Sequence, residues 1–270
     1  MTTGWINRCR SSASRWVRRL IGREQTPPGP WPWLRAGDAD SISIDRFDSQ
    51  PVLVLAPHPD DEVIGPGGAV RRHVLAGAPV AVVVLTDGKW GGYDPDHTLC
   101  QRRKAESIRA AQILGTQAPV FLDAPDGNLS ETREILDALQ KIIRKHQPKY
   151  IYLPALTDQH HDHWATNSIL NMLLAQLPPD VALRLIIRGY EVWTPLPANR
   201  LVDITAVADL KRQAINAFTS QVSTYDYAGA ILGLNHYRSL QSLRGHGFAE
   251  ALMEISADDF RQYFRLLRGQ

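Results

Sequence analysis

Cysteine is scarce in this chain of 270 residues, which contains only Cys9 and Cys100. The two lie far apart and form no C-x-x-C pair, so the sequence predicts neither a disulfide framework nor a thiolate zinc site. Such low cysteine usage is typical of a reducing compartment, and we expect a cytoplasmic protein. Any metal that the chain binds must then be held by histidine and carboxylate ligands.

Long apolar runs and an excess of one charge are also missing. No apolar run approaches the roughly 20 residues needed to span a bilayer. The formal net charge is only +2, so composition gives no reason to expect a nucleic-acid partner. Apolar residues make up 44% of the chain and charged residues 21%, which is ordinary for a globular protein with a real core. The length suffices for one large α/β domain or two small ones.

The N-terminal segment, residues 1–24, differs from the rest of the chain. Apolar residues recur there at helical spacing between arginines, and Glu24 is the single acid, so the pattern predicts a basic amphipathic helix. The arginines interrupt every stretch that could serve as a signal-peptide core. Two interpretations stay open: a peripheral membrane anchor, and a solvated extension or a helix packed on the domain. The proline-rich run 27–33 reads as a linker, so we expect an extension over 1–40 and one domain over 41–270.

Short apolar runs alternate with helical segments from residue 51 onward. We expect strands at 52–55, 80–85, 119–122, 150–153 and 182–187, and helices at 67–76, 98–114, 131–145 and 164–177. This alternation is typical of βαβ units. It predicts a single α/β domain, a Rossmann-like, mainly parallel sheet with helices on both faces. In such folds ligands bind beyond the carboxyl ends of the strands.

A histidine and three acids follow the first predicted strand, in the run Pro57-His58-Pro59-Asp60-Asp61-Glu62. Such groups are costly at the end of a buried strand unless something neutralises them. His58 and Asp61 are three residues apart on a tight turn and could converge on one cation, which leaves Asp60 free to act on a metal-bound water. The alternative is a polar loop whose acids cap the next helix.

A second cluster, His160-His161-Asp162-His163, follows the fourth predicted strand and so falls at the same edge of the sheet. Alone it could be a solvated loop, but two clusters at one edge make coincidence a poor explanation. Two histidines, one carboxylate and an open water position form a ligand set typical of catalytic zinc. Such a metal lowers the pKa of its bound water from about 16 to roughly 7.

The two motifs together resemble the PIG-L/LmbE-like zinc-dependent N-acetylglucosaminyl deacetylases. The resemblance runs from Val52 to Gln221 and departs from the common pattern at Pro57, Pro66 and His161. Further matching segments are Thr86-Asp87-Gly88, Arg103-x-x-Glu106, Phe121 to Gly127, Tyr190 to Trp193, Val202-Asp203-Ile204, Lys211 and Ser220-Gln221.

This resemblance implies a hydrolase that removes an acetyl group from an N-acetylated amino sugar. It implies that His58, Asp61 and His163 hold one zinc ion per chain and that Asp60 is the general base. It also implies that His160 stabilises the tetrahedral oxyanion while Asp162 orients its imidazole. A protonated His160 beside Asp162 would have its charged form favoured.

The resemblance also implies substrate contacts from Arg103 and Asp126, the latter through sugar hydroxyls. The alternative is that Arg103 and Glu106 form an ion pair on a helix surface and that Asp126 is a turn residue. The implied partner is a small N-acetylated sugar conjugate. The basic, aromatic N-terminus favours a lipid-linked one slightly, with peripheral membrane contact through residues 1–24. The oligomeric state cannot be read from the sequence.

Three other functions compete with this prediction. A Rossmann-like nucleotide- or sugar-binding protein without hydrolytic activity would use the glycines at 65, 67 and 68, but Val70 breaks the G-x-G-x-x-G pattern. A two-metal phosphoesterase would need a bridging carboxylate and further ligands. A scaffold that had lost activity is disfavoured because every residue of the two motifs that the chemistry needs is present.

Overall fold

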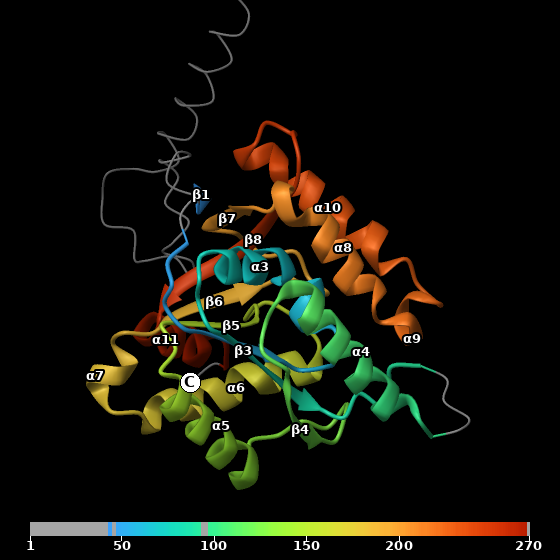
Figure 1. Ribbon diagram of the computed structural model, residues 1–270. Coiled ribbons are helices and arrows are strands. Elements are labelled where there is room, and N and C mark those ends of the chain that lie inside the picture. The colour runs from blue at the N-terminus through green and yellow to red at the C-terminus, as the bar shows by residue number, and fades with distance from the viewer. Residues whose placement is uncertain (1–42, 45–46, 93–96, 269–270) are drawn as a thin grey trace, which may run out of the picture. The chain divides into compact units, whose positions relative to one another are not determined.

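An eight-stranded sheet forms the centre of the computed structural model, which describes residues 43–44, 47–92 and 97–268 (Figure 1). Its strand order is β1-β7-β8-β6-β5-β2-β3-β4. All neighbouring strands are parallel except β8, which runs antiparallel to both β6 and β7. The strands are β1 (Ser43–Ile44), β2 (Val52–Ala56), β3 (Val80–Thr86), β4 (Val120–Ala124), β5 (Tyr150–Pro154), β6 (Ile186–Tyr190), β7 (Arg200–Asp203) and β8 (Ala249–Ser256).

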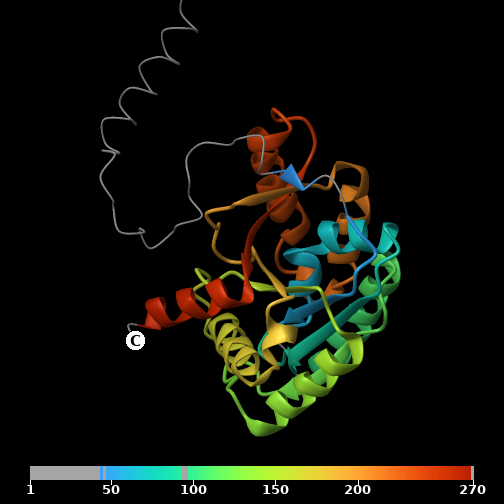
Figure 2. The same ribbon diagram turned by 90° about the vertical axis from the view of Figure 1, so that its left-hand side faces the viewer.

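Helices cover both faces of the sheet, and the two layers are seen edge-on in Figure 2. One layer contains α2 (Asp61–Ile64), α3 (Gly67–Leu75), α4 (Leu99–Leu114), α8 (Ala208–Asn216), α9 (Thr219–Val222) and α10 (Tyr227–Ser242). The other contains α5 (Arg133–His146), α6 (His161–Gln176) and α11 (Ala257–Arg268). Two short elements, α7 (Pro179–Ala182) and the 3-10 helix η2 (Thr205–Val207), lie in connections. The predicted fold class is confirmed.

The central strands are buried along their whole length because both faces of the sheet are covered. Every residue of β2 and β3 is buried, and both strands consist of valine, leucine and alanine apart from the final threonine of β3. Continuous apolar runs of this kind are typical of parallel strands between two helical layers. The amphipathic helix α5 shows how the layers attach, since it buries Ile135, Leu139 and Ile143 from one side only.

The fifth predicted strand was displaced. The strand expected at 182–187 begins at Ile186 instead, because residues 179–182 form the helical turn α7. Pro179 stands at the first helical position, where its fixed φ angle favours a helix and its missing N–H costs nothing. The predicted extension over 1–40 lies outside the described residues. No helix among those described has the length and apolar character needed to cross a membrane.

The C-terminal part of the chain is joined to the turn that follows β2 by a buried ion pair. On β8, the carboxylate of Glu250 accepts hydrogen bonds from the backbone N–H groups of Gly68 (2.6 Å) and Ala69 (2.8 Å), at the start of α3. The Nζ of Lys211 donates to the same carboxylate (2.7 Å) and to the carbonyl oxygen of Gly65 (3.0 Å). A carboxylate at a helix N-terminus satisfies N–H groups that have no partner within the helix.

The chain order places a ligand site between β2 and β5. After β2 the chain moves outward to β3 and β4, then returns to add β5 on the other side of β2. Parallel sheets open a crevice at such a reversal, beyond the carboxyl ends of the strands. The two histidine and acid motifs directly follow β2 and β5, so the topology brings them to this crevice.

Candidate active site

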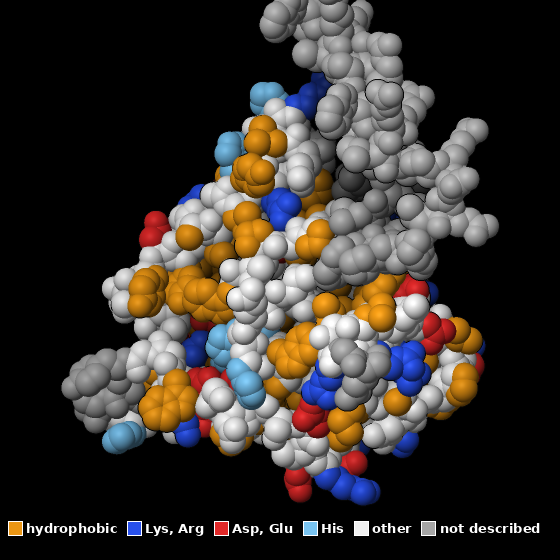
Figure 3. Space-filling view, turned by 180° about the vertical axis from the view of Figure 1, so that it is seen from behind, with side chains coloured by type: hydrophobic (Ala, Val, Ile, Leu, Met, Phe, Trp, Pro, Cys, Tyr) orange, Lys and Arg blue, Asp and Glu red, His pale blue; other side chains and the backbone are white. Residues whose placement is uncertain are grey.

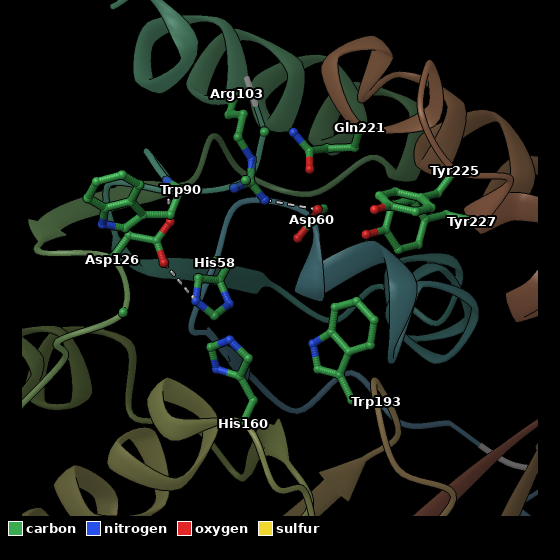
Figure 4. Close-up of a pocket in the computed structure, with 13 residues that line it drawn as sticks. His58, Asp60, Trp90, Arg103, Asp126, His160, Trp193, Gln221, Tyr225 and Tyr227 are labelled. Carbon is green, nitrogen blue, oxygen red and sulfur yellow. Dashed lines mark hydrogen bonds and ion pairs between the residues drawn. The ribbon is translucent and has the colours of Figure 1, made fainter. Parts of the chain in front are cut away.

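A cavity of about 470 Å³ opens where the loops after β2, β3, β4 and β5 meet. Its size is typical of small-molecule sites. His58, Asp60, Arg103, Asp126 and His160 line it (Figure 4). The cavity lies on the face shown in Figure 3, where histidine side chains sit in a hollow and hydrophobic side chains gather on both sides.

One carboxylate oxygen of Asp61 joins the two motifs. Its Oδ2 lies 3.2 Å from Nδ1 of His58 and 3.3 Å from Nε2 of His163. Two ligand atoms that share a tetrahedral zinc ion at its usual bond lengths are about 3.4 Å apart. Each of these two separations therefore suits a pair of ligands to one ion, and the resemblance implied that all three residues hold it.

His163 is fully buried, and neither of its ring nitrogens makes a well-aligned hydrogen bond within the described part of the chain. Nε2 faces Asp61, and Nδ1 lies 3.3 Å from Oδ2 of Asp158. A metal ligand whose second ring nitrogen faces a carboxylate is a common arrangement in metal sites. The sequence analysis missed Asp158, although its place in the segment between β5 and α6, five residues before His163, was a usable signal.

The second ring nitrogen of His58 faces further acids. Nε2 lies 3.0 Å from Oδ2 of Asp162 and 3.2 Å from Oδ1 of Asp126. Two sets of possible ligand atoms lie within 4.8 Å of one another: one from His58, His160 and His163, the other from His58, Asp126 and Asp162. Neither set contains Asp61, which instead sits between His58 and His163.

Carboxylates surround the two histidines His58 and His163. Burial acts to lower the pKa of His163, but the charge of Asp61 and the nearby carboxylate of Asp158 outweigh it and raise that pKa to about 9. His58 likewise has a pKa well above its usual value, because contacts with Asp126, Asp162 and Asp61 outweigh the effect of burial. Burial acts to raise the pKa of Asp61, yet His163 and His58 hold it far below its usual value. A divalent cation bound there would compete with protons for these ring nitrogens, and imidazole and carboxylate groups are donors that such a cation accepts.

Asp60 has an unfavourable backbone conformation, with φ 129° and ψ −24°. Non-glycine residues rarely adopt positive φ angles, and such strain clusters at functional sites. Its side chain does not cap the next helix, because Asp60 makes no side-chain hydrogen bond to the backbone of α2. Burial raises the pKa of Asp60 to about 6, against the opposing charge of Arg103.

Arg103 from α4 fixes Asp60. Its Nη2 donates to Oδ2 of Asp60 (2.9 Å) and to the carbonyl oxygen of Pro59 (2.5 Å), and its Nη1 donates to the carbonyl oxygen of Gly88 (2.9 Å). The alternative of a surface ion pair with Glu106 is wrong, because both side chains are buried and Glu106 binds elsewhere. Glu106 accepts hydrogen bonds from the hydroxyl of Thr219 (2.8 Å), the backbone N–H of Ser220 (2.9 Å) and the hydroxyl of Ser220 (2.6 Å).

Glu62 also stabilises the turn that contains Asp60. Its carboxylate accepts hydrogen bonds from the backbone N–H of Asp60 (2.8 Å) and from the hydroxyl of Ser107 (2.5 Å). Burial raises the pKa of Glu62 to about 7. Helix α4 therefore reaches the strained turn through two residues, Arg103 and Ser107.

His160 and Asp162 interact differently from the expectation. The carboxylate of Asp162 contacts His58 and His161 and accepts the N–H groups of Gly127 (2.7 Å) and Leu129 (3.1 Å), whereas its backbone N–H donates to Nδ1 of His160 (3.1 Å). The reason is local, because His160 is the N-cap residue of α6 and Asp162 lies in its first turn.

The expectation that the charged form of His160 is favoured is also wrong. Its pKa is lowered, first by burial and then by the positive charges of His58 and His163. The neutral ring accepts a hydrogen bond at Nδ1, so its proton resides on Nε2.

Asp126 lies in the cavity wall, as the resemblance implied, but part of its carboxylate is already engaged. Oδ1 faces His58, and Oδ2 accepts the backbone N–H of Trp90 (2.8 Å). The sequence analysis gave no role to the aromatic residues around the cavity, Trp90, Trp193, Tyr225 and Tyr227. Aromatic residues in loops and at the start of a helix carry no periodic signal that would have marked them.

Comparison with known proteins places the two motifs in a recognised family. Residues 53–173 match the family profile described as PIG-L, GlcNAc-PI de-N-acetylase. The chain is 32% identical over 189 residues to a diacetylchitobiose deacetylase of Thermococcus kodakarensis. The matched region covers 64% of this chain and 71% of that protein.

Two solved structures share the fold. The N,N′-diacetylchitobiose deacetylase from Pyrococcus horikoshii superposes with a TM-score of 0.66 at 24% identity, over 93% of this chain and 94% of that chain. The 4-carboxy-2-hydroxymuconate hydratase GalB from Pseudomonas putida superposes with a TM-score of 0.65 at 23% identity, over 76% of this chain and 96% of that chain. The same fold thus carries names for two different reactions, so the fold alone does not select the chemistry.

Proposed function

The chain belongs to the PIG-L family, and on that premise we propose that it is a metal-dependent hydrolase that removes the acetyl group from an N-acetylated amino sugar conjugate. The observation that carries the proposal is the position of Asp61 between His58 and His163, with Asp60 beside it in the wall of one cavity. The names of its relatives support the substrate class, since the Thermococcus protein is a deacetylase of an N-acetylated sugar.

We propose that His58, Asp61 and His163 hold one zinc ion per chain. When bound, zinc supplies a nucleophile at neutral pH by lowering the pKa of a water to about 7, and it polarises the amide carbonyl. Asp158 orients His163, and Asp162 orients His58, because each carboxylate faces the ring nitrogen that points away from Asp61.

Asp60 is the proposed general base. An amide is a poor electrophile with a poor leaving group, so its hydrolysis needs both a base for the attacking water and an acid for the amine. Asp60 lies in the cavity wall next to Asp61 and can take the proton from the water and return it to the departing nitrogen. Arg103 holds the carboxylate in place while this proton moves.

His160 is the proposed donor to the developing oxyanion. Its ring lies 4.7 Å from that of His58, measured between centroids, and it lines the cavity. Because Nδ1 accepts the N–H of Asp162, the ring offers its Nε2–H as a donor. Donors positioned in advance where negative charge develops contribute strongly to such reactions. Asp162 contributes by fixing this tautomer through its backbone.

Asp126 and Arg103 are proposed to contact the substrate as well, Asp126 through a sugar hydroxyl. We further propose that residues 41–270 form the catalytic domain and that 1–40 lie outside it.

Cytoplasmic localisation, peripheral membrane contact through residues 1–24 and a lipid-linked substrate stay predictions from the sequence. Deletion of residues 1–33 should leave hydrolysis of a small water-soluble substrate intact; loss of that activity would mean that the extension builds the site.

Metal analysis combined with an acetate-release assay tests the proposal. The panel contains several N-acetylglucosaminyl conjugates, one of them lipid-linked, and an unsaturated tricarboxylate as a hydratase control. About one zinc per chain, with acetate release that a chelator abolishes and zinc restores, is the expected result. Stoichiometric zinc with hydration of the tricarboxylate and no acetate release would reject the deacetylase in favour of the other reaction that this fold hosts. Absence of stoichiometric metal would reject the metal-dependent mechanism altogether.

A further inference from the structure

Two exposed tryptophans flank the mouth of the cavity. Trp90 is 73% exposed and Trp193 is 59% exposed, although tryptophan is a residue that proteins usually bury to a large extent. Figure 4 shows them on opposite sides of the cavity, with His58 and His160 between them. Large aromatic surfaces beside a polar cavity indicate a surface that is covered when a ligand binds.

Each tryptophan is tied by its backbone to the proposed metal centre. The N–H of Trp90 donates to Oδ2 of Asp126 (2.8 Å), whose Oδ1 lies 3.2 Å from His58. The N–H of Trp193 donates to Oδ2 of Asp158 (3.1 Å), and the same oxygen lies 3.3 Å from His163. Two carboxylates that face the proposed ligands His58 and His163 thus also hold the backbone from which the two aromatic side chains project.

The surroundings of the two rings keep them in place at the mouth. The Nζ of Lys89 lies 5.4 Å from the centroid of the Trp90 ring, within the range of a cation–π contact. Next along the chain, a side chain at Gly91 would collide with the guanidinium of Arg103, so glycine lets this loop pass close to the cavity. On the other side, the ring of Trp193 meets Tyr227 edge-on at 6.4 Å between centroids.

We propose that Trp90 and Trp193 bind the pyranose ring attached to the reacting amino sugar. This inference rests on the proposed function for the identity of the reacting sugar, and it adds the class of group that the sugar carries. A pyranose ring has faces of C–H groups and an edge of hydroxyl groups, so it can stack on an indole while its hydroxyls reach Lys89 and water. An acyl chain would need a continuous apolar groove, whereas the space between the tryptophans has a floor of histidines and carboxylates.

The test compares binding of a one-ring and a two-ring sugar. Calorimetry measures the affinity of N-acetylglucosamine and of N,N′-diacetylchitobiose for protein treated with a chelator, so that turnover does not interfere. Trp90→Ala and Trp193→Ala should each weaken disaccharide binding about tenfold and change monosaccharide binding less than about twofold. Trp193→Phe, which keeps a flat ring, should retain most of the affinity. Tyr237→Ala, which removes an exposed aromatic residue from α10 away from the cavity, is the matched control and should change neither affinity.

Trp193→Leu separates a stacking role from a structural one. Leucine keeps the apolar character but not the flat face, so the disaccharide affinity should fall as it does in Trp193→Ala while the melting temperature stays that of the parent protein. Equal weakening of both sugars, or no change for either, would overturn the proposal. The two proposals fail separately: tryptophan-dependent binding without acetate release rejects only the proposed function, whereas acetate release with no effect of either tryptophan rejects only the pyranose site.

Discussion

The guanidinium of Arg103 and the carboxylate of Asp60 form a buried ion pair, with Nη2 2.9 Å from Oδ2. The same guanidinium bonds the carbonyl oxygens of Pro59 and Gly88, so one side chain holds the strained residue, the residue before it and the loop that follows β3. This makes Arg103 foremost a positioning residue for Asp60, a role that the resemblance did not imply.

Arg103→Lys should therefore lower kcat by about 10- to 100-fold and change KM by less than about threefold. Lysine keeps the positive charge but cannot reproduce the fork of a guanidinium. Steady-state kinetics of acetate release measure both parameters, with Arg109→Lys on the exposed side of the same helix as control. A rise in KM at constant kcat would assign Arg103 to substrate binding instead.

Asp60→Asn should lower turnover by about 10²- to 10⁴-fold and leave the zinc content at one per chain, because it removes the proposed base and none of the proposed ligands. His163→Ala should lose both zinc and activity. Metal analysis and the acetate assay on both variants check this, with Asp209→Asn on the exposed face of α8 as control. Near-normal turnover by Asp60→Asn would show that another group is the base.

The strain at Asp60 predicts a difference between two inactive variants. At φ 129° glycine is at ease whereas alanine is strained, so Asp60→Gly should be more stable than Asp60→Ala by about 1 kcal/mol or more. Both lose the same carboxylate, and the comparison therefore isolates the backbone. Urea unfolding measures the free energies, and equal stability would mean that the turn relaxes once the side chain is gone.

Asp158→Asn should weaken zinc binding by about 10- to 100-fold. The amide can still accept a hydrogen bond, but it loses the negative charge that faces Nδ1 of His163. Competition with a chromophoric chelator gives the affinity, and Asp180→Asn, an exposed change of the same kind on α7, serves as control. An unchanged zinc affinity would confine Asp158 to its contacts with the loop backbone.

His73 predicts a loss of stability in acid. Burial, and after it the charge of Arg188, lower the pKa of His73 to about 3 in the folded protein, whereas an unfolded chain has a histidine pKa of about 6.5. Between these values the unfolded state binds the extra proton, so the free energy of unfolding falls as pH falls, by up to about 1.4 kcal/mol per pH unit. Urea unfolding at pH 7 and pH 5 should show a shallower dependence for His73→Gln than for the parent protein. An identical dependence would mean that His73 titrates alike in both states.

The sequence predicted the central strands because strands buried on both faces consist of apolar residues alone. It made no prediction for β8, where charged residues interrupt the apolar pattern. The buried Glu250 and the half-buried Glu254 are compatible with this strand because Lys211 pairs with the first and Arg188 and Arg200 pair with the second. Those partners lie far away in the chain, and local patterning cannot reveal them.

The residues of the site likewise fall into those that the sequence revealed and those that it did not. The residues of the two motifs could be found because they stand together in the sequence at the ends of strands, and the structure brings them to one cavity. The contacts of Asp158 with His163 and Trp193, and that of Trp90 with Asp126, join segments that follow different strands, so they depend on how the strands are ordered. The orientation of Asp162 depends on the N-cap of α6, since the helix points its carboxylate at His58 and leaves only its backbone for His160.

Because Lys211 and Glu250 bind the turn that follows β2, we expect that the two histidine and acid motifs cannot be moved to another protein without the C-terminal part of the chain. The family profile ends at residue 173, and a fragment cut there would contain every proposed ligand. Such a fragment would, however, lack Glu250, which binds the start of α3, and Ser220, which binds Glu106. It would also lack β6, which pairs with β5. Unpaired N–H groups and a bare sheet edge would remain next to the motif. Exchange of segments between related proteins is therefore confined to the loops around the cavity, because such exchanges keep the contacts between the part of the chain before residue 173 and the part after it.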